Sequence, residues 1–242
     1  MTVSMTNGGT IGMADARPDH RTGTGVDKVL RVVAEGPLGP YPMLEAAFCW
    51  NERRPVGWRR LGPAPTTPQR QLPVAQTGQP AAAARLTRLL TTMTWAVSTP
   101  VGGSAVLTRV DVTAEAYHRV LRALAGAWRD GRRMLACPET AAAHYPAALA
   151  VWRMAALLAP TDQTAGVLTF AVSTPAAALL RSAAPVLALP HTVLERGARS
   201  TVVRVDRPAL FRRLLADLDP PALAGRPGVS LTGRRAPVAV AG

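Results

Sequence analysis

Residues 94–100 of this chain read Thr-Trp-Ala-Val-Ser-Thr-Pro, and residues 169–175 read Thr-Phe-Ala-Val-Ser-Thr-Pro. Both stretches have the β-branched and aromatic composition of a strand. Each is followed by a second strand-like stretch that ends in Arg-Val-Asp, at residues 109–111 and 204–206, and then by an amphipathic helical pattern. The order strand, connection, strand, helix therefore occurs twice, which predicts an internal duplication.

The two copies differ in the connection between their strands. It is about ten residues long in the first copy and about thirty in the second, where residues 175–189 predict a helix that begins at a proline. A short connection allows an antiparallel hairpin, and a long helical one allows a crossover between parallel strands. Doubled units of this kind build ferredoxin-like folds. We therefore expect an α+β protein of two ferredoxin-like (RRM-like) lobes, with Trp95 and Phe170 buried at equivalent positions on central strands.

Outward from the repeat, the chain divides into three segments. Residues 1–27 are rich in Gly, Thr and Asp and lack apolar periodicity, which predicts a flexible tail. Residues 28–165 form the first expected lobe, which contains a proline-rich loop at 61–80, and residues 166–242 form the second.

Local patterns predict five further elements. Residues 29–34 are short and β-branched and predict a strand, whereas residues 43–50 have apolar positions at helical spacing and predict a helix. Residues 81–93 have the composition of a helix, residues 129–133 predict a basic turn around an Asp-Gly pair, and residues 138–158 predict a largely apolar helix.

The composition excludes wholesale disorder and indicates a polyanionic partner. Of the 242 residues 48% are hydrophobic, which is ordinary for a protein with a core. The chain has 28 Lys+Arg against 15 Asp+Glu, a net charge of +13, and Lys28 is its one lysine. Solubility alone does not require so large an excess of positive charge. Nucleic acid is therefore the expected partner, ahead of an acidic peptide or an anionic membrane surface.

No sequence feature indicates export, membrane insertion or a cofactor. Cys49 and Cys137 do not form a C-x-x-C pair, and the N-terminal stretch has no apolar segment of a signal peptide. His144, Tyr145 and Arg153 interrupt the longest apolar run, which excludes a membrane span. We expect a cytoplasmic protein that uses no metal and no cofactor.

Common enzyme motifs are missing from the sequence. It has no Gly-x-Ser-x-Gly, His-Glu-x-x-His or P-loop pattern and no Gly-x-Gly-x-x-Gly after a strand, which favours a non-catalytic protein. If the chain were a metal-independent ribonuclease, its general base would be His118, His144 or His191.

Three basic clusters are candidate RNA-binding sites. In the first, Arg53, Arg54, Arg59 and Arg60 flank Trp58. Arginine binds phosphate bidentately and an indole ring stacks on an unpaired base, although a solvated loop around a core tryptophan explains the same residues. The other two clusters lie beside expected turns and consist of Arg129, Arg132 and Arg133, and of Arg234 and Arg235. Arginines on connections suit contacts with backbone phosphates.

The start of the ordered chain carries a resemblance to a known family. Residues 29–50 combine a strand-like stretch, a proline-bearing turn and the helix Met-Leu-Glu-Ala-Ala-Phe-Cys-Trp. This order resembles the RAMP superfamily of CRISPR-associated proteins, nearest to the type IV-like subunit that caps the 5′ handle of the guide RNA. The resemblance implies an RNA-binding subunit of an antiviral ribonucleoprotein, with RNA and other protein subunits as partners.

Two alternative functions stay open at this point. One is a guide-RNA-processing endoribonuclease that needs no metal. The other is a cofactor-independent tailoring enzyme that acts on a ribosomal peptide with an acidic leader, which the positive charge permits.

Overall fold

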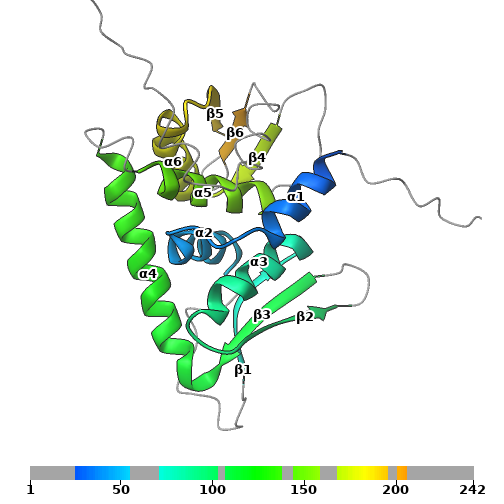
Figure 1. Ribbon diagram of the computed structural model, residues 1–242. Helices are drawn as coiled ribbons and strands as arrows, with labels where there is room; N and C mark the ends of the chain where they lie inside the picture. The colour runs from blue at the N-terminus through cyan, green and yellow to red at the C-terminus, as the bar shows by residue number, and fades with distance from the viewer. Residues whose placement is uncertain are drawn as a thin grey trace, which may run out of the picture.

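The chain folds into two small antiparallel sheets with a pair of central helices between them (Figure 1). The computed structural model describes residues 25–54, 71–102, 107–137, 144–158, 168–195 and 201–205. This architecture confirms the expected α+β class. Most of the predicted tail at residues 1–27, the helical pattern after the second Arg-Val-Asp, and Arg234 and Arg235 lie outside the described residues, and the three-segment division stays a prediction. Residues 25–27 of the predicted tail belong to a helix.

The first sheet has the strand order β1-β3-β2, with all neighbours antiparallel. Its strands are β1 (Gln71–Thr77), β2 (Ala96–Val101) and β3 (Leu107–Thr113). Helix α3 (Pro80–Thr91) lies between β1 and β2 in sequence and contacts all three strands, and α4 (Ala114–Ala136) follows β3 directly. The short connection between β2 and β3 therefore makes the hairpin that its length predicts.

The second sheet repeats this topology. Its strands β4 (Leu168–Val172), β5 (His191–Glu195) and β6 (Thr201–Val205) have the order β4-β6-β5, again antiparallel. Helix α6 (Thr174–Ala183) and the short 3-10 helix η3 (Pro185–Leu187) lie between its first and second strands, as α3 does in the first sheet. In each sheet the strand that comes last in the sequence is therefore the central strand.

The central helices α2 (Pro42–Arg53) and α5 (Tyr145–Leu158) pack against each other. Residues 44–50 of α2 and 147–158 of α5 are buried without interruption, so both helices are enclosed on every side rather than amphipathic. Their C-terminal ends meet, since Arg53 Nη2 donates a hydrogen bond to the Leu158 carbonyl oxygen at 3.4 Å. This pair joins the two sheet units into one core.

Two expectations near the start of the chain are wrong. Residues 29–34 belong to helix α1 (Gly25–Glu35), not to a strand, because Leu30, Val33 and Ala34 at i, i+3 and i+4 face the core and outweigh the β-branched composition. The expected loop at 61–80 contains strand β1, although it is rich in proline. Pro73 lies beside a register shift on an edge strand, where a missing N–H donor is tolerated.

The expected turn at 129–133 is also wrong, because these residues lie inside the 23-residue helix α4. Gly131 is buried where α4 crosses α2, and a Cβ atom at this position would stand 2.2 Å from Leu44 Cδ1. The glycine therefore permits a close approach of two helices and does not mark a chain reversal.

The predicted internal repeat is only half correct. Residues 94–100 contribute to β2, the second strand of its unit, whereas residues 169–175 contribute to β4, the first strand of its unit. The expected equivalence of Trp95 and Phe170 therefore fails, and Trp95 is 53% exposed rather than buried on a central strand. The Arg-Val pairs of the second motif do occupy equivalent central strands, β3 and β6. Ferredoxin-like lobes are not confirmed by the described strands.

Other local predictions are confirmed. The helix expected at 43–50 is α2, with Pro42 in its first turn, and the helix expected at 81–93 is α3. Helix α6 with η3 fills most of the helical connection expected at 175–189. No helix among the described residues is both long and apolar enough to cross a membrane.

Replacing Gly131 by Ala should destabilise the protein by about 1–3 kcal/mol, because the added methyl group overlaps Leu44 in a packed interface. Gly126→Ala is the matched control, since it lies in the same helix with no atom within 4 Å of the added Cβ. It should stabilise the helix by up to about 1 kcal/mol. Urea unfolding of both variants measures the difference, and equal effects would contradict the proposed close contact.

The two thiols should react very differently. Cys49 is buried in α2, and this burial raises the pKa of its thiol to about 12, whereas Cys137 is exposed at the end of α4. Because the thiolate is the reactive form, iodoacetamide at pH 8 should modify Cys137 in the native protein and Cys49 only after unfolding. Mass spectrometry of the labelled peptides checks this. Rapid native labelling of Cys49 would show that the α2–α5 core opens.

Candidate nucleic-acid interface

Each sheet has one face packed on helices and one face that we call its open face. In β3, Val110 and Val112 are fully buried towards the helices, so the alternate residues Arg109 and Asp111 lie on the open face. In β6, Val203 and Val205 are fully buried and Arg204 between them is exposed. The sequence Arg-Val thus places an arginine on the open face of the central strand in both sheets.

The strand register places similar polar neighbours beside the two arginines. Arg109 is paired with Gln76 of β1 and Thr99 of β2. Arg204 is paired with Thr169 of β4 and Thr192 of β5. Because paired residues point to the same side of a sheet, each open face has a row of the form polar, Arg, polar across its three strands. We call these the Arg109 row and the Arg204 row.

An ion pair orients the arginine of the first row. Arg109 Nε donates to Asp111 Oδ2 at 2.9 Å, and the two residues share the open face because they are two apart in a strand. The Arg109 side chain remains 43% exposed while that of Asp111 is 1% exposed. The buried carboxylate therefore holds a guanidinium group that is still open to an external anion.

Apolar side chains are also exposed at these faces. Leu194 of β5 is paired with Val202 of β6 beside the Arg204 row and is 48% exposed. Trp95 is exposed just before β2. The open-face positions of the two rows themselves hold no aromatic residue.

Arg53 and Arg54 lie at the C-terminal end of α2, not on a loop, and make contacts within the protein. Arg53 bonds to the end of α5, and the Arg54 guanidinium lies 4.2 Å from the centre of the Trp50 ring and donates to Asn51 Oδ1. Both side chains close the C-terminal end of α2. Trp58, Arg59 and Arg60 lie outside the described residues.

The remaining candidate arginines and histidines lie on separate elements. Arg129, Arg132 and Arg133 are exposed on α4. His118 is exposed on α4 against the Tyr117 ring, with ring centres 5.6 Å apart, while His144 precedes α5 and His191 lies in β5 with Nδ1 3.2 Å from the Leu189 carbonyl oxygen. Within the described ranges, no three His, Cys, Asp or Glu side chains gather as a metal site would require.

In the sequence, Arg109 and Arg204 belong to the two Arg-Val-Asp stretches that predict a repeat, and the three basic clusters do not include them. The available signal was strand alternation. In a strand whose valines face a core, the arginine next to them must face the other way.

Comparisons with known proteins indicate a fold but not a family. No protein-family model and no curated protein matches the chain. The structure of full-length DUF199/WhiA from Thermatoga maritima aligns with 78% of this chain at 9% sequence identity and a TM-score of 0.51. The fold is similar to that of DUF199/WhiA. The chain covers 60% of that protein's length, and at this identity the likeness concerns the fold alone.

A second solved structure, the N-terminal LAGLIDADG domain of DUF199/WhiA, aligns with 79% of this chain and 90% of its own. The identity is 10% and the TM-score is 0.49. The fold assignment rests on the full-length structure.

These findings correct the resemblance drawn from residues 29–50. The RAMP assignment is wrong, because the fold is similar to that of full-length DUF199/WhiA and because the stretch taken as the first RAMP strand is helix α1. The guide-RNA-binding, antiviral function that depended on this assignment is wrong with it. The endoribonuclease and the peptide-tailoring enzyme gain no support from the fold either.

Proposed function

We propose that this chain binds double-stranded DNA through the open faces of its two sheets. The observation that carries the proposal is the Arg109 row and the Arg204 row, one on each open face at topologically equivalent positions. Arginine and short polar side chains are the groups with which proteins contact phosphates and base edges.

The charge of the chain supports a polyanionic ligand. The net charge of +13 attracts phosphate over a distance and speeds association. A cytoplasmic location is part of this proposal, since such a protein must share a compartment with DNA.

A duplex fits the open faces better than a single strand does. Sheets that bind single-stranded nucleic acid stack successive bases on several aromatic rings across their strands, whereas neither row has one and the exposed Trp95 lies before β2, at the edge of the first open face. Antiparallel strands can enter the major groove of B-DNA, whereas the major groove of A-form RNA is too narrow and deep for side chains to read. We therefore propose DNA rather than RNA as the duplex.

We also propose that the two sheet units arose by duplication. The support is the shared order of helix, strand, helix, strand, strand in the two units, together with the shared position of the Arg-Val pair. Two similar units would give a duplex two similar contacts.

The Arg204→Gln variant tests the proposal most directly, because Arg204 is exposed. Affinity for a duplex of about 20 base pairs, measured by fluorescence anisotropy at several salt concentrations, should fall, and the salt slope should decrease by about 0.9 for the lost phosphate contact. Arg181→Gln removes the same charge from the exposed side of α6 and is the control. Equal slopes for the two variants would contradict a role for the Arg204 row.

The Arg109 row needs a double substitution, since removing Arg109 alone would leave the buried Asp111 carboxylate unpaired. Arg109→Gln combined with Asp111→Asn keeps the net charge at +13. A decrease of about 0.9 in the salt slope would then report the lost local contact rather than a weaker overall field. An unchanged slope in a folded variant would exclude this row from the interface.

A further inference from the structure

Helix α4 carries a row of arginines that the sheet-face proposal does not use. The buried side of α4 includes Val120, Leu124, Trp128, Gly131 and Leu135, and it packs mainly on α2. At about 100° per residue, four exposed arginines fall within an arc of about 80° on the opposite side. These residues, which we call the α4 arginine row, are Arg119, Arg122, Arg129 and Arg133.

The α4 arginine row is long, straight and only partly neutralised. Its ends are 14 residues apart, which corresponds to about 21 Å of helix. Exposed Arg132 lies beside it, and the exposed acids of α4 are Glu115 and Asp130. Arg133 is 4.0 Å from Asp130, with 81% and 71% of the two side chains exposed, so this pair contributes little. Arg119 Nη2 also donates to the Met93 carbonyl oxygen at 3.4 Å.

Chemistry favours a phosphate backbone over a protein as the ligand of this row. A protein interface needs apolar or aromatic anchors at its centre, and the large apolar side chains exposed among the described residues are Val32, Trp95 and Leu194, none of them on α4. Phosphates need only charge and donors, and guanidinium groups supply both. A length of about 21 Å along the axis of B-DNA contains about six phosphates of each strand, at 3.4 Å of axis per phosphate.

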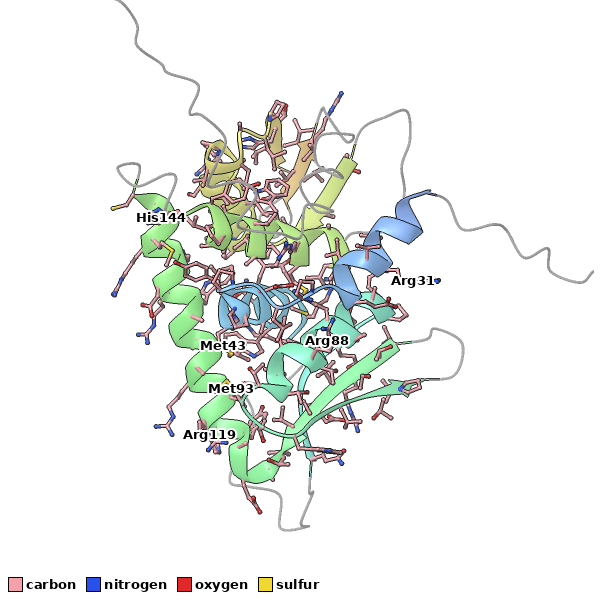
Figure 2. The ribbon with its side chains drawn as sticks, in the orientation of Figure 1. Arg31, Met43, Arg88, Met93, Arg119 and His144 are labelled. Carbon is pink, nitrogen blue, oxygen red and sulfur yellow. The ribbon has the colours of Figure 1, made fainter. Side chains whose placement is uncertain are left out.

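The row and the open faces are different surfaces. The row points away from α2, and nitrogen-tipped side chains project from the outer side of α4 (Figure 2). The open faces point away from α3 and α6, which cover the other side of the two sheets. A duplex held against a sheet therefore leaves the α4 arginine row available.

We infer that the α4 arginine row is a second phosphate-binding surface, which takes the backbone of a second DNA duplex. This inference rests on the proposed function for the first duplex. One chain then holds two duplex segments at once, and the contacts on the α4 side are to the phosphate backbone.

Counting duplexes per chain tests the inference. A 12-base-pair duplex is titrated into the full chain, and sedimentation velocity measures the number bound. The unaltered chain should bind two, and Arg122→Gln/Arg129→Gln should bind one at the same concentrations. Arg31→Gln/Arg181→Gln, which removes two exposed arginines from α1 and α6, is the charge-matched control and should still bind two.

Capture on beads tests simultaneous binding. Beads with one duplex should retain a second, labelled duplex through the unaltered chain and the control, but not through Arg122→Gln/Arg129→Gln. One duplex per unaltered chain, or equal capture by the row variant and the control, would overturn the inference. The Arg204→Gln variant reports separately on the sheets. If it binds both duplexes with unchanged affinity while the row variant loses one, the proposed sheet interface fails and the α4 surface stands.

Discussion

A single buried carboxylate, that of Glu45 in α2, organises the helices on which both sheets rest. Arg85 of α3 donates to it through Nε at 2.8 Å and through Nη2 at 3.2 Å, and each side chain is 1% exposed. Arg85 also donates to the carbonyl oxygens of Gly36 and Pro37, which follow α1. From α5, the guanidinium of Arg153 is also buried, which lowers its pKa, while the Glu45 carboxylate acts in the opposite direction. A buried charge must be paired, so the Glu45–Arg85 pair fixes α3 and the end of α1 against α2.

The same helix positions the second sheet through another carboxylate. Glu52 lies seven residues after Glu45, about two turns along α2. Its two oxygens accept hydrogen bonds from the backbone N–H of Ser173, at 2.9 Å, and from the Ser173 hydroxyl group. Ser173 is the N-cap of α6, where a negative charge is favoured, and α6 covers the second sheet. The Arg109 row and the Arg204 row thus take their positions from two acids of one helix.

Local sequence patterns correctly predicted the elements whose structure depends mainly on local interactions. Helices α2 and α3 and the β2–β3 hairpin followed from propensity, proline placement and connection length, whereas the errors lie where tertiary contacts prevail. The sequence around Gly131 predicts a turn, and only the contact with Leu44 explains why a glycine lies inside a helix. Residues 94–100 and 169–175 share a short sequence, but they pair at different places in their sheets. The contacts of two candidate site residues could not be predicted for the same reason. Nothing local shows that Arg53 and Arg54 close the end of α2.

Three acids are engaged inside the fold, while several arginines lie on its surface. Glu45, Glu52 and Asp111 each bind a partner within the protein, to hold α3, α6 and Arg109 respectively. The arginines of α4 and Arg204 are exposed at the same time. Because Arg85 pairs with Glu45 and Arg109 with Asp111, these carboxylates are neutralised by arginines of the fold itself, and the positive field at the surface comes from other arginines, such as those of α4. The acids that stabilise the fold therefore do not oppose the α4 arginine row.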